Sequence, residues 1–267
     1  METIDIVQHN ILLSCTSKQK FSQEQFWGEH TLSILLSGEG IIYNNDETQF
    51  YTPGTVGLLK RNQLAKSLKI PSADGTPFKS IGIILDQESL RKYSTENDIV
   101  ITLPYTGKTM LQLHQNRFIT GFFESLLPYF DQPEKLTKRL SELKTIEAIE
   151  LLLSYDSGLK GLLFDFSELF KIDLENFMNH HFTYNVSIRE FAKLTGRSIS
   201  TFKRDFKKVS SQTPEKWLKE KRLDKAHFLI AEKKQRPSEV YLQVGFENFS
   251  HFSRSFKEKF GYNASTV

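Results

Sequence analysis

The last third of this chain contains one residue pattern twice, and this repeat restricts the fold more than any other feature. Each copy has a short segment of helical periodicity, a glycine, a turn, and a second segment carrying Phe-x-Arg-x-Phe-Lys. Gly196 and Gly245 are 49 residues apart, whereas Phe202 and Phe252 are 50 apart. The pattern therefore indicates an internal duplication in which the second turn has one additional residue.

The residues around each turn predict a helix-turn-helix. Ser187 and Glu190 have the spacing of a capping box, which opens a short helix. Gly196 can adopt the positive φ that ends this helix, and Ser198 can cap the next one. Because the second copy repeats the arrangement, we expect two helix-turn-helix units.

The second helix of each copy has an apolar stripe and a polar face. The stripe comprises Ile199, Phe202, Phe206 and Val209 in the first copy and Phe249, Phe252, Phe256 and Phe260 in the second. The polar face comprises Ser200, Lys203, Arg204 and Lys207 in the first copy and Ser250, Ser253, Arg254 and Lys257 in the second. Arginine can pair with guanine through two hydrogen bonds, and lysine and serine reach bases or phosphates. A single basic helix face is usually only solvated, but two matched faces favour insertion into the major groove of DNA.

The segment between the two copies predicts a long connecting helix. Thr213 and Pro214 read as an N-cap followed by proline at the first helical position, and the amphipathic pattern continues to about Glu232. A helix of this length spans about 28 Å, and successive major-groove faces on one side of B-DNA lie about 34 Å apart. The connecting helix is therefore expected to hold the two units about one DNA turn apart.

Residues 168–267 resemble the DNA-binding domain of AraC/XylS-type regulators. The resemblance is carried by Phe202-x-Arg204-x-Phe206-Lys207, Arg222-Leu223-x-x-Ala226, Val244-Gly245-Phe246 and Phe252-x-Arg254-x-Phe256-Lys257-x-x-Phe260-Gly261. It implies a bacterial transcription regulator that binds double-stranded promoter DNA, with RNA polymerase as a further partner and activation as the expected effect. By position it implies base contacts from Ser200, Lys203, Arg204, Phe249, Ser250, Ser253 and Arg254. Phe249 also belongs to the apolar stripe, so a core position is the alternative, and Ser210 and Ala264 replace the family's usual residues at two turns.

Charge is distributed unevenly between the two parts of the chain. Residues 171–267 contain 19 Lys and Arg against 11 Asp and Glu, a balance of +8, whereas residues 1–170 have a balance of −5. This asymmetry is typical of a basic nucleic-acid-binding domain joined to a different domain. The only cysteine is Cys15, and no apolar run has the length of a membrane span. The N-terminus lacks the pattern of a signal peptide, so we expect a cytoplasmic protein without a membrane partner.

Residues 1–105 predict a β domain. The expected strands are Ile6–Ser14, Thr31–Ser37, Gly40–Asn44, Phe50–Thr52, Thr55–Leu59, Leu64–Ile70 and Phe78–Leu85, separated by turn residues. The segment Leu35–Gly40 and Pro53-Gly54-Thr55-Val56 are similar to the cupin-like sensor domains that precede this DNA-binding domain in the family. Metal-binding cupins need several histidines, but His30 stands alone, so we expect no metal and no cofactor. Trp27, His30 and Tyr43 are candidates for binding a small-molecule effector. The alternatives are core positions for the aromatic residues and an ordinary strand end for His30.

Residues 106–160 change to helical periodicity. One expected segment carries Leu111, Phe118, Phe122 and Leu126, and a second carries a stripe of Leu136, Leu140, Leu143, Ile146, Ile149 and Leu153. One stripe should pack on the β domain, and the other either packs within the chain or pairs with a second copy in a homodimer. The expected class is α+β, with a cupin-like barrel and helical pair before an all-α double helix-turn-helix domain. No catalytic motif is recognisable, and the alternative to a regulator is a cupin-like enzyme or ligand-binding protein with an added basic domain.

Overall fold

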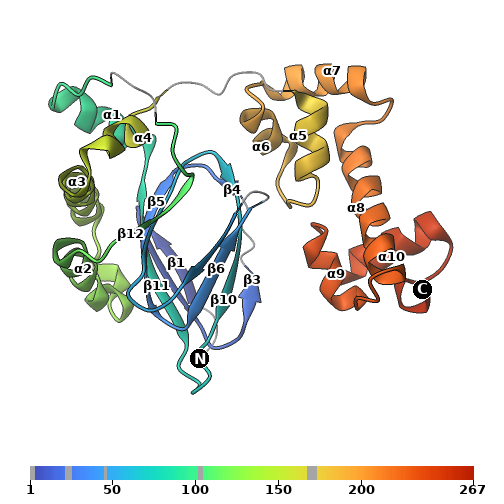
Figure 1. Cartoon of the computed structure of the whole chain (residues 1–267), viewed down its shortest axis with the longest axis horizontal. Coiled ribbons are helices and arrows are strands. Elements are labelled where there is room, and N and C mark those ends of the chain that lie inside the picture. The colour runs from blue at the N-terminus through green and yellow to red at the C-terminus, as the bar shows by residue number, and fades with distance from the viewer. Residues whose placement is uncertain (1–3, 22–25, 45–46, 102–104, 167–172) are drawn as a thin grey trace. The chain divides into compact units, whose positions relative to one another are not determined.

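A computed structural model describes residues 4–21, 26–44, 47–101, 105–166 and 173–267. The chain divides into two compact units, one comprising Met1–Ser22 and Trp27–Ser167, the other Gln23–Phe26 and Glu168–Val267. The first is called the sheet-containing unit below, and the second is called the helical unit. Antiparallel sheets in the first and helices throughout the second confirm the expected α+β class (Figure 1).

The sheet-containing unit is built around a six-stranded antiparallel sheet. Its strand order is β1-β2-β11-β5-β8-β12, and the strands span Ile4–Gln8, Ile11–Thr16, Phe78–Leu85, His30–Ser37, Val56–Leu59 and Met110–Leu113. The central pair β11 and β5 carries buried residues at neighbouring positions, such as Ile81, Gly82 and Ile83. Because neighbouring side chains point to opposite faces of a sheet, both faces of this pair are covered.

A four-stranded sheet has the order β3-β10-β6-β7, and a short two-stranded sheet pairs β4 with β9. These strands span Lys20–Phe21, Lys66–Ile70, Glu39–Tyr43, Thr48–Tyr51, Phe26–Trp27 and Gln63–Leu64. A small core of Leu35, Tyr51 and Phe78 joins residues of the six-stranded and four-stranded sheets. The other face of the six-stranded sheet shares a larger core with the helices that follow it.

The helices of this unit lie together on one side of the sheets (Figure 1). They are α1, α2, α3 and α4, at Gln87–Glu96, Arg117–Glu124, Lys138–Tyr155 and Lys160–Leu163. Short 3-10 turns lie at Leu127–Phe130, Pro133–Lys135 and Ser157–Leu159. Ile81 on β11, Phe122 on α2 and Leu152 on α3 belong to one buried cluster, so the helical segment completes the core of the β domain.

Three local sequence predictions were wrong in this unit. The strand expected over Ile6–Ser14 is a hairpin, because His9 takes a positive φ of 53° between β1 and β2. Helix α1 occupies a region predicted to contain only strands, and Asp86 caps it by accepting from the Ser89 N–H. Leu111 lies on strand β12 and not on a helix, because β12 pairs with β8 across the chain. Such pairing depends on residues distant in sequence and has no local signal.

The predicted apolar stripe of α3 is mostly not the buried face. The helix buries Ser141, Thr145, Ala148, Ile149 and Leu152, whereas Leu140, Leu143 and Ile146 are 38%, 46% and 39% exposed. The two hydroxyl residues face inward because they bond the β1–β2 turn: the backbone N–H of Asn10 donates to Ser141 Oγ, and the Asn10 side chain donates to Thr145 Oγ1.

The helical unit confirms two helix-turn-helix units joined by a long helix. Helices α5 to α10 span Leu174–His181, Ile188–Leu194, Ile199–Val209, Pro214–Ala231, Pro237–Gln243 and Phe249–Phe260, and a 3-10 turn follows at Ala264–Thr266. The first helix-turn-helix is α6–α7, the second is α9–α10, and α8 connects them (Figure 1). Thr213 caps α8 as predicted, accepting from the Lys216 N–H.

The two departures from the family pattern fit their turns. Ser210 ends α7 in extended backbone, with φ −148° and ψ 142°, so this turn does not need glycine. Ala264 is buried at the start of the last turn. Among the described residues, no helix has the length and apolar character needed to cross a membrane.

Two glycines with the same backbone conformation should differ in how much an added side chain destabilises the fold. Gly38 and Gly75 have φ of 81° and 85°, but a Cβ would lie 2.5 Å from the Ile70 carbonyl oxygen only at Gly38. We expect Gly75→Ala to lower the free energy of unfolding by about 1–2 kcal/mol, the cost of the left-handed conformation. Gly38→Ala should lower it by roughly 2–5 kcal/mol, because overpacking is added to that strain. Urea unfolding of both variants measures this, and equal losses would contradict the assigned clash.

Candidate nucleic-acid interface

The two helix-turn-helix units begin and end where the sequence predicts. Ser187 and Glu190 form the complete capping box at the start of α6, and Gly196 turns with a φ of 64°. Ser198 then caps α7 by accepting from the Thr201 N–H. In the second unit, Gly245 has a φ of 93°, and Asn248 caps α10 by accepting from the His251 N–H. These caps satisfy backbone donors that helix starts leave unpaired.

Burial of paired phenylalanines fixes the orientation of α7 and α10. Phe202, Phe206, Phe252 and Phe256 have at most 1% of their surface exposed. The ends of the first predicted stripe are not core residues, since Ile199 and Val209 are about two-fifths exposed. The buried stripe is therefore narrower than the sequence indicated, and each helix rests on its central pair of rings.

Phe249, predicted both as a core residue and as a DNA contact, lies at the edge of the core. It is 43% exposed, and its ring packs against Tyr241 and Phe252 with centroids 5.4 and 6.1 Å apart. The ring therefore closes the hydrophobic cluster of α10 and also presents one side to solvent.

The predicted polar faces of α7 and α10 are at the surface. All the residues of these two faces are exposed except Ser253, which is half-buried; the residues are Ser200, Lys203, Arg204, Lys207, Ser250, Ser253, Arg254 and Lys257. The side chain of Arg204 is 70% exposed. Neither Arg204 nor Arg254 is enclosed by the protein, so both guanidinium groups remain accessible to a partner.

Acidic residues lie beside the polar face of α7, which the sequence did not indicate. Lys203 Nζ lies 3.0 Å from Glu215 on α8, and Arg204 Nε lies 3.6 Å from Asp205. The hydrogen bond from Arg197 holds the pKa of the Asp205 carboxyl below its usual range. The side chains of Lys203, Glu215 and Arg204 are about half exposed or more, and such pairs contribute little to stability. They can therefore separate when a phosphate group approaches.

The two copies differ in how the turn is joined to the second helix. In the first copy, Arg197 Nε donates to Asp205 Oδ2 at 3.1 Å. The corresponding residues of the second copy are Phe246 and Ser255, both buried. Within the described part of the chain, Arg254 and Lys257 belong to none of the ion pairs. In the first copy, by contrast, Lys203 and Arg204 each pair with a carboxylate.

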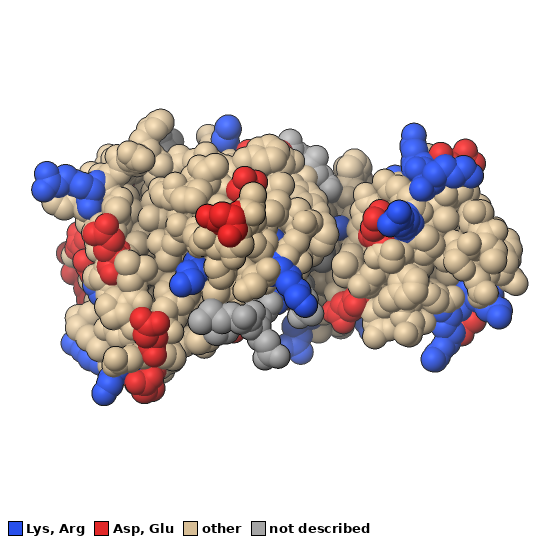
Figure 2. Space-filling model, turned by 90° about the horizontal axis from the view of Figure 1, so that it is seen from below, with Lys and Arg blue, Asp and Glu red and all other residues tan. Residues whose placement is uncertain are grey.

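Figure 2 shows one face of the molecule with the charged side chains coloured. In the helical unit, Lys and Arg project from several separate places on this face, and acidic side chains lie next to some of them. The net positive charge of this unit is thus not gathered in one continuous patch on the face shown. Binding of nucleic acid must depend on particular side chains as well as on overall charge.

Two of the three effector candidates, His30 and Trp27, lie near the segment that follows β8. His30 is fully buried at the start of β5, and its Nδ1 accepts from the Arg61 N–H at 3.2 Å. Burial, with the nearby charges of Arg61 and Lys60, lowers the pKa of His30 to about 3, so the ring is neutral. Its Nε2 has no hydrogen-bond partner within the described residues. His30 is a strand-end residue, as expected, but a buried one.

Trp27 and Tyr43 have different neighbours. Trp27 lies on β4, which pairs with β9 at Gln63–Leu64, so it approaches the same segment as His30. Tyr43 ends β6, where it pairs with Lys66, and burial raises the pKa of its hydroxyl. Among the described residues, no group of three His, Cys, Asp or Glu side chains is arranged to hold a metal ion.

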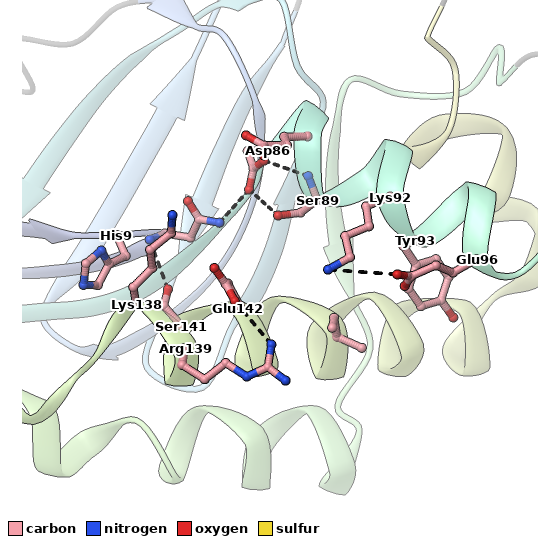
Figure 3. A pocket seen from close by; sticks show the side chains of 13 residues that line it. His9, Asp86, Ser89, Lys92, Tyr93, Glu96, Lys138, Arg139, Ser141 and Glu142 are labelled. Atoms are coloured by element: carbon pink, nitrogen blue, oxygen red, sulfur yellow. Dashed lines mark hydrogen bonds and ion pairs between the residues drawn. The ribbon is translucent and has the colours of Figure 1, made fainter.

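A cleft of 390 Å³ lies between α1 and α3 (Figure 3). Two ion pairs line it, each within a single helix: Lys92 with Glu96 at 4.0 Å and Arg139 with Glu142 at 3.5 Å. At its inner end, Asp86 accepts from the Ser89 N–H and hydroxyl and from the Asn10 amide. The paired side chains and Asp86 thus have partners within the protein and do not converge on a point in the cleft.

Two family models match the chain. The model described as the ExsA N-terminal regulatory domain matches residues 30–163, and a helix-turn-helix domain model matches residues 191–267. The virulence regulon transcriptional activator VirF of Yersinia enterocolitica is 30% identical over 88% of this chain and 87% of its own length. The transcriptional regulator ExsA of Pseudomonas aeruginosa is 23% identical over 89% of this chain and 85% of its own. A crystal structure of an apo ToxT variant from Vibrio cholerae, 13% identical, aligns over 97% of both chains with a TM-score of 0.49.

Because His30 is buried and neutral, we expect the free energy of unfolding of the chain to fall in acid. Its pKa is about 3 in the folded chain and about 6.5 when unfolded. Its contribution is therefore complete above pH 6.5 and is lost as the pH falls toward 3, with about 2 kcal/mol lost at pH 5. Urea unfolding at several pH values measures this.

Other acidic and histidine groups also titrate in this range, so the variant His30→Gln isolates the effect. We expect the dependence of its unfolding free energy on pH to be flatter than that of the parent chain by this amount. His9→Gln is the control, since His9 is exposed and its replacement should leave the slope unchanged. An equally steep slope in His30→Gln would contradict the assignment.

Proposed function

Because this chain belongs to the AraC-type family of helix-turn-helix transcription regulators, with an ExsA-type N-terminal regulatory domain, we propose that it activates transcription from promoters that it binds through both units. Helices α7 and α10, called the reading helices below, enter successive major grooves. The polar residues Ser200, Lys203, Arg204, Lys207, Ser250, Ser253, Arg254 and Lys257 make the contacts. Phe249 approaches the DNA with the exposed side of its ring.

The observation that carries this proposal is the matched exposure of Arg204 and Arg254 on two helices whose opposite sides are buried phenylalanines. Arginine is the side chain best suited to pair with guanine in the major groove. Lys207 and Lys257 lie three residues further along the same helices, where they reach phosphates. Within the described residues Arg204 pairs with Asp205 and Arg254 belongs to no ion pair, so Arg254 is expected to contribute more to the free energy of DNA binding.

Activation, and not repression, is supported by the names of the relatives. VirF is named a transcriptional activator, and an activator implies RNA polymerase as a partner. We place the protein in the cytoplasm for the same reason, since its DNA and its polymerase are there. The burial of His30, with one ring nitrogen lacking a hydrogen-bond partner within the described residues, supports an effector that reaches this end of the sheet near Trp27. Tyr43, on another strand, is the weaker candidate.

A homodimer is the proposed assembly, through the outer face of α3. Leu140, Leu143 and Ile146 are exposed there, although the same helix has a separate buried face. Exposed leucines at helical spacing are typical of a surface that pairs with another helix. Ile146 also lines the cleft between α1 and α3, so this apolar face borders the charged rim seen in Figure 3.

Replacement of either arginine predicts a defined loss of DNA binding. Arg204→Ala and Arg254→Ala should each weaken binding by about 1–3 kcal/mol if each arginine pairs with a base. The measurement is a gel shift or footprint on the promoter next to its own gene, repeated at increasing salt. Arg117→Ala removes the same charge from an exposed position on α2, outside the proposed dimer face, and should leave affinity unchanged. Arg204 and Arg254 variants that bind the operator as tightly as the parent chain would contradict the assigned contacts. A parent chain that binds random duplexes as tightly as the promoter would contradict sequence-specific binding.

A charge on the outer face of α3 should separate the dimer. We expect Leu143→Lys to raise the dimer dissociation constant at least about tenfold, because a buried unpaired charge in an interface is strongly unfavourable. Sedimentation velocity over a concentration series measures the change. Val100→Lys, at a residue that is 78% exposed and lies outside α2 and α3, is the control. A monomeric parent chain, or an unchanged dimer in Leu143→Lys, would contradict this interface.

A further inference from the structure

The two helix-turn-helix units are joined by more than the covalent connection through α8. Residues Phe182–Asn185 link α5 to α6 and lie against both α8 and the turn of the second unit. They are called the clamp segment below. Arg222, on α8, donates from Nε to the Phe182 carbonyl at 2.7 Å and from Nη2 to the Tyr184 carbonyl at 2.6 Å. One guanidinium thus holds two carbonyl groups of the clamp segment.

The turn of the second unit packs on the same segment. A Cβ at Gly245 would lie 2.6 Å from the Thr183 carbonyl oxygen and 3.0 Å from Arg222 Nε. Only glycine allows this approach, and its φ of 93° is also one that other residues rarely adopt. Two residues further on, Glu247 accepts a hydrogen bond from the Asn185 amide at 2.5 Å. The clamp segment therefore bridges α8 and the second unit directly.

The duplication does not explain these contacts. Arg222 lies on the connecting helix, which occurs once, and the clamp segment precedes only the first unit. On the second side, α8 is tied to α10 by Lys259, which lies 2.6 Å from Asp224 and donates to the Glu220 carbonyl. Helix α8 is thus fixed to both units, through Arg222 on one side and Lys259 on the other.

The chemistry of Arg222 suits a positioning role. Phe182 is the residue that ends α5, so its carbonyl is one that the helix leaves unpaired, and a cation there is favoured by the helix dipole. The planar guanidinium can reach two carbonyls in fixed directions, which an ammonium group cannot do. A cleft of 670 Å³ borders Arg222 and is lined by residues of both helix-turn-helix units, including Ser187, Asn248 and His251. Beside this open cleft, the contacts of Arg222 are part of what holds the two helix-turn-helix units together.

We propose that Arg222 is a positioning residue for DNA recognition: by clamping residues 182–185 between α8 and the Gly245 turn, it holds the two reading helices at the separation of successive major grooves. This rests on the proposed function, since it concerns how both units bind one operator together. Arg222 itself need not touch DNA. Its loss removes the fixed relation between the units and leaves each unit able to bind its own half of the operator.

The test compares whole operators with half operators. The operator is first selected from promoter fragments with the parent chain, and duplexes are then made in which either half is scrambled or extra base pairs separate the halves. In Arg222→Gln and Arg222→Lys, affinity for each half should remain within about twofold of the parent. Affinity for the whole operator should fall roughly ten- to a hundredfold, because binding of the second half no longer benefits from a fixed spacing. The penalty for inserted base pairs should also become smaller.

Arg222→Lys and two further variants separate the alternatives. Arg222→Lys keeps the charge and loses the two-pronged geometry, so it should behave like Arg222→Gln. Lys225→Gln removes a charge from the exposed side of α8 and should keep the whole-operator affinity and the spacing preference. Asn185→Ala removes the side-chain hydrogen bond to Glu247 and should lower the whole-operator affinity and the spacing penalty in the same direction by a smaller factor.

The outcomes distinguish this proposal from the proposed function. A parent chain that selects no operator overturns the proposed function. A parent chain that selects one, with Arg222 variants that keep its whole-operator affinity and spacing preference, overturns only the positioning role. If the Arg222 variants lose both half-operator binding and the helical circular dichroism signal, their defect is purely structural. The spacing preference of Asn185→Ala then decides, and an unchanged preference in that variant overturns the proposal.

Discussion

Burial of one pair of phenylalanines beneath each reading helix is the constraint on which the proposed DNA-binding surface depends. Phe202 and Phe206, like Phe252 and Phe256, are removed from water almost completely. Burying a phenylalanine side chain is worth about 1.5–3 kcal/mol, so rotating either helix to hide its arginine would forfeit several kcal/mol. The outward direction of Arg204 and Arg254 follows from the core and requires no interaction of their own. The polar face can therefore vary with the operator while the fold is retained.

Electrostatics makes the two units unequal even though their frameworks match. In the first unit Arg197 and Glu215 each take part in an ion pair close to the DNA-binding face, and Lys203 and Arg204 both have carboxylate neighbours. In the second unit, buried Phe246 and Ser255 stand at the positions of Arg197 and Asp205. Carboxylates near phosphate oppose binding, whereas isolated cations favour it. The duplication thus supplies two similar scaffolds, and substitution of a few side chains gives them different charge environments.

In the sheet-containing unit, both faces of the central strands are covered by other elements. The four-stranded sheet covers one face and the helices α1 to α4 the other. Helix α3 must then serve the core with the side that meets the β1–β2 turn, and that side carries Ser141 and Thr145 because the turn offers polar partners. Its leucines at 140 and 143 are left on the surface. A helix with apolar residues on two of its sides can pack against the core with one side and still expose the other.

Local sequence determined the double helix-turn-helix almost completely. Caps, glycines and phenylalanine spacing act within a few residues, so Ser187, Gly196, Ser198 and Thr213 have the structural roles that the pattern indicates. Tertiary structure alone decided which side of α3 is buried, that Leu111 pairs in a sheet, and that Lys203 meets Glu215. It also decided that Arg222 reaches the carbonyls of Phe182 and Tyr184, about 40 residues away in the chain. The physical reason is that caps and periodicity are short-range properties of the backbone, whereas strand pairing, burial and ion pairs depend on which distant residues the folded core brings together.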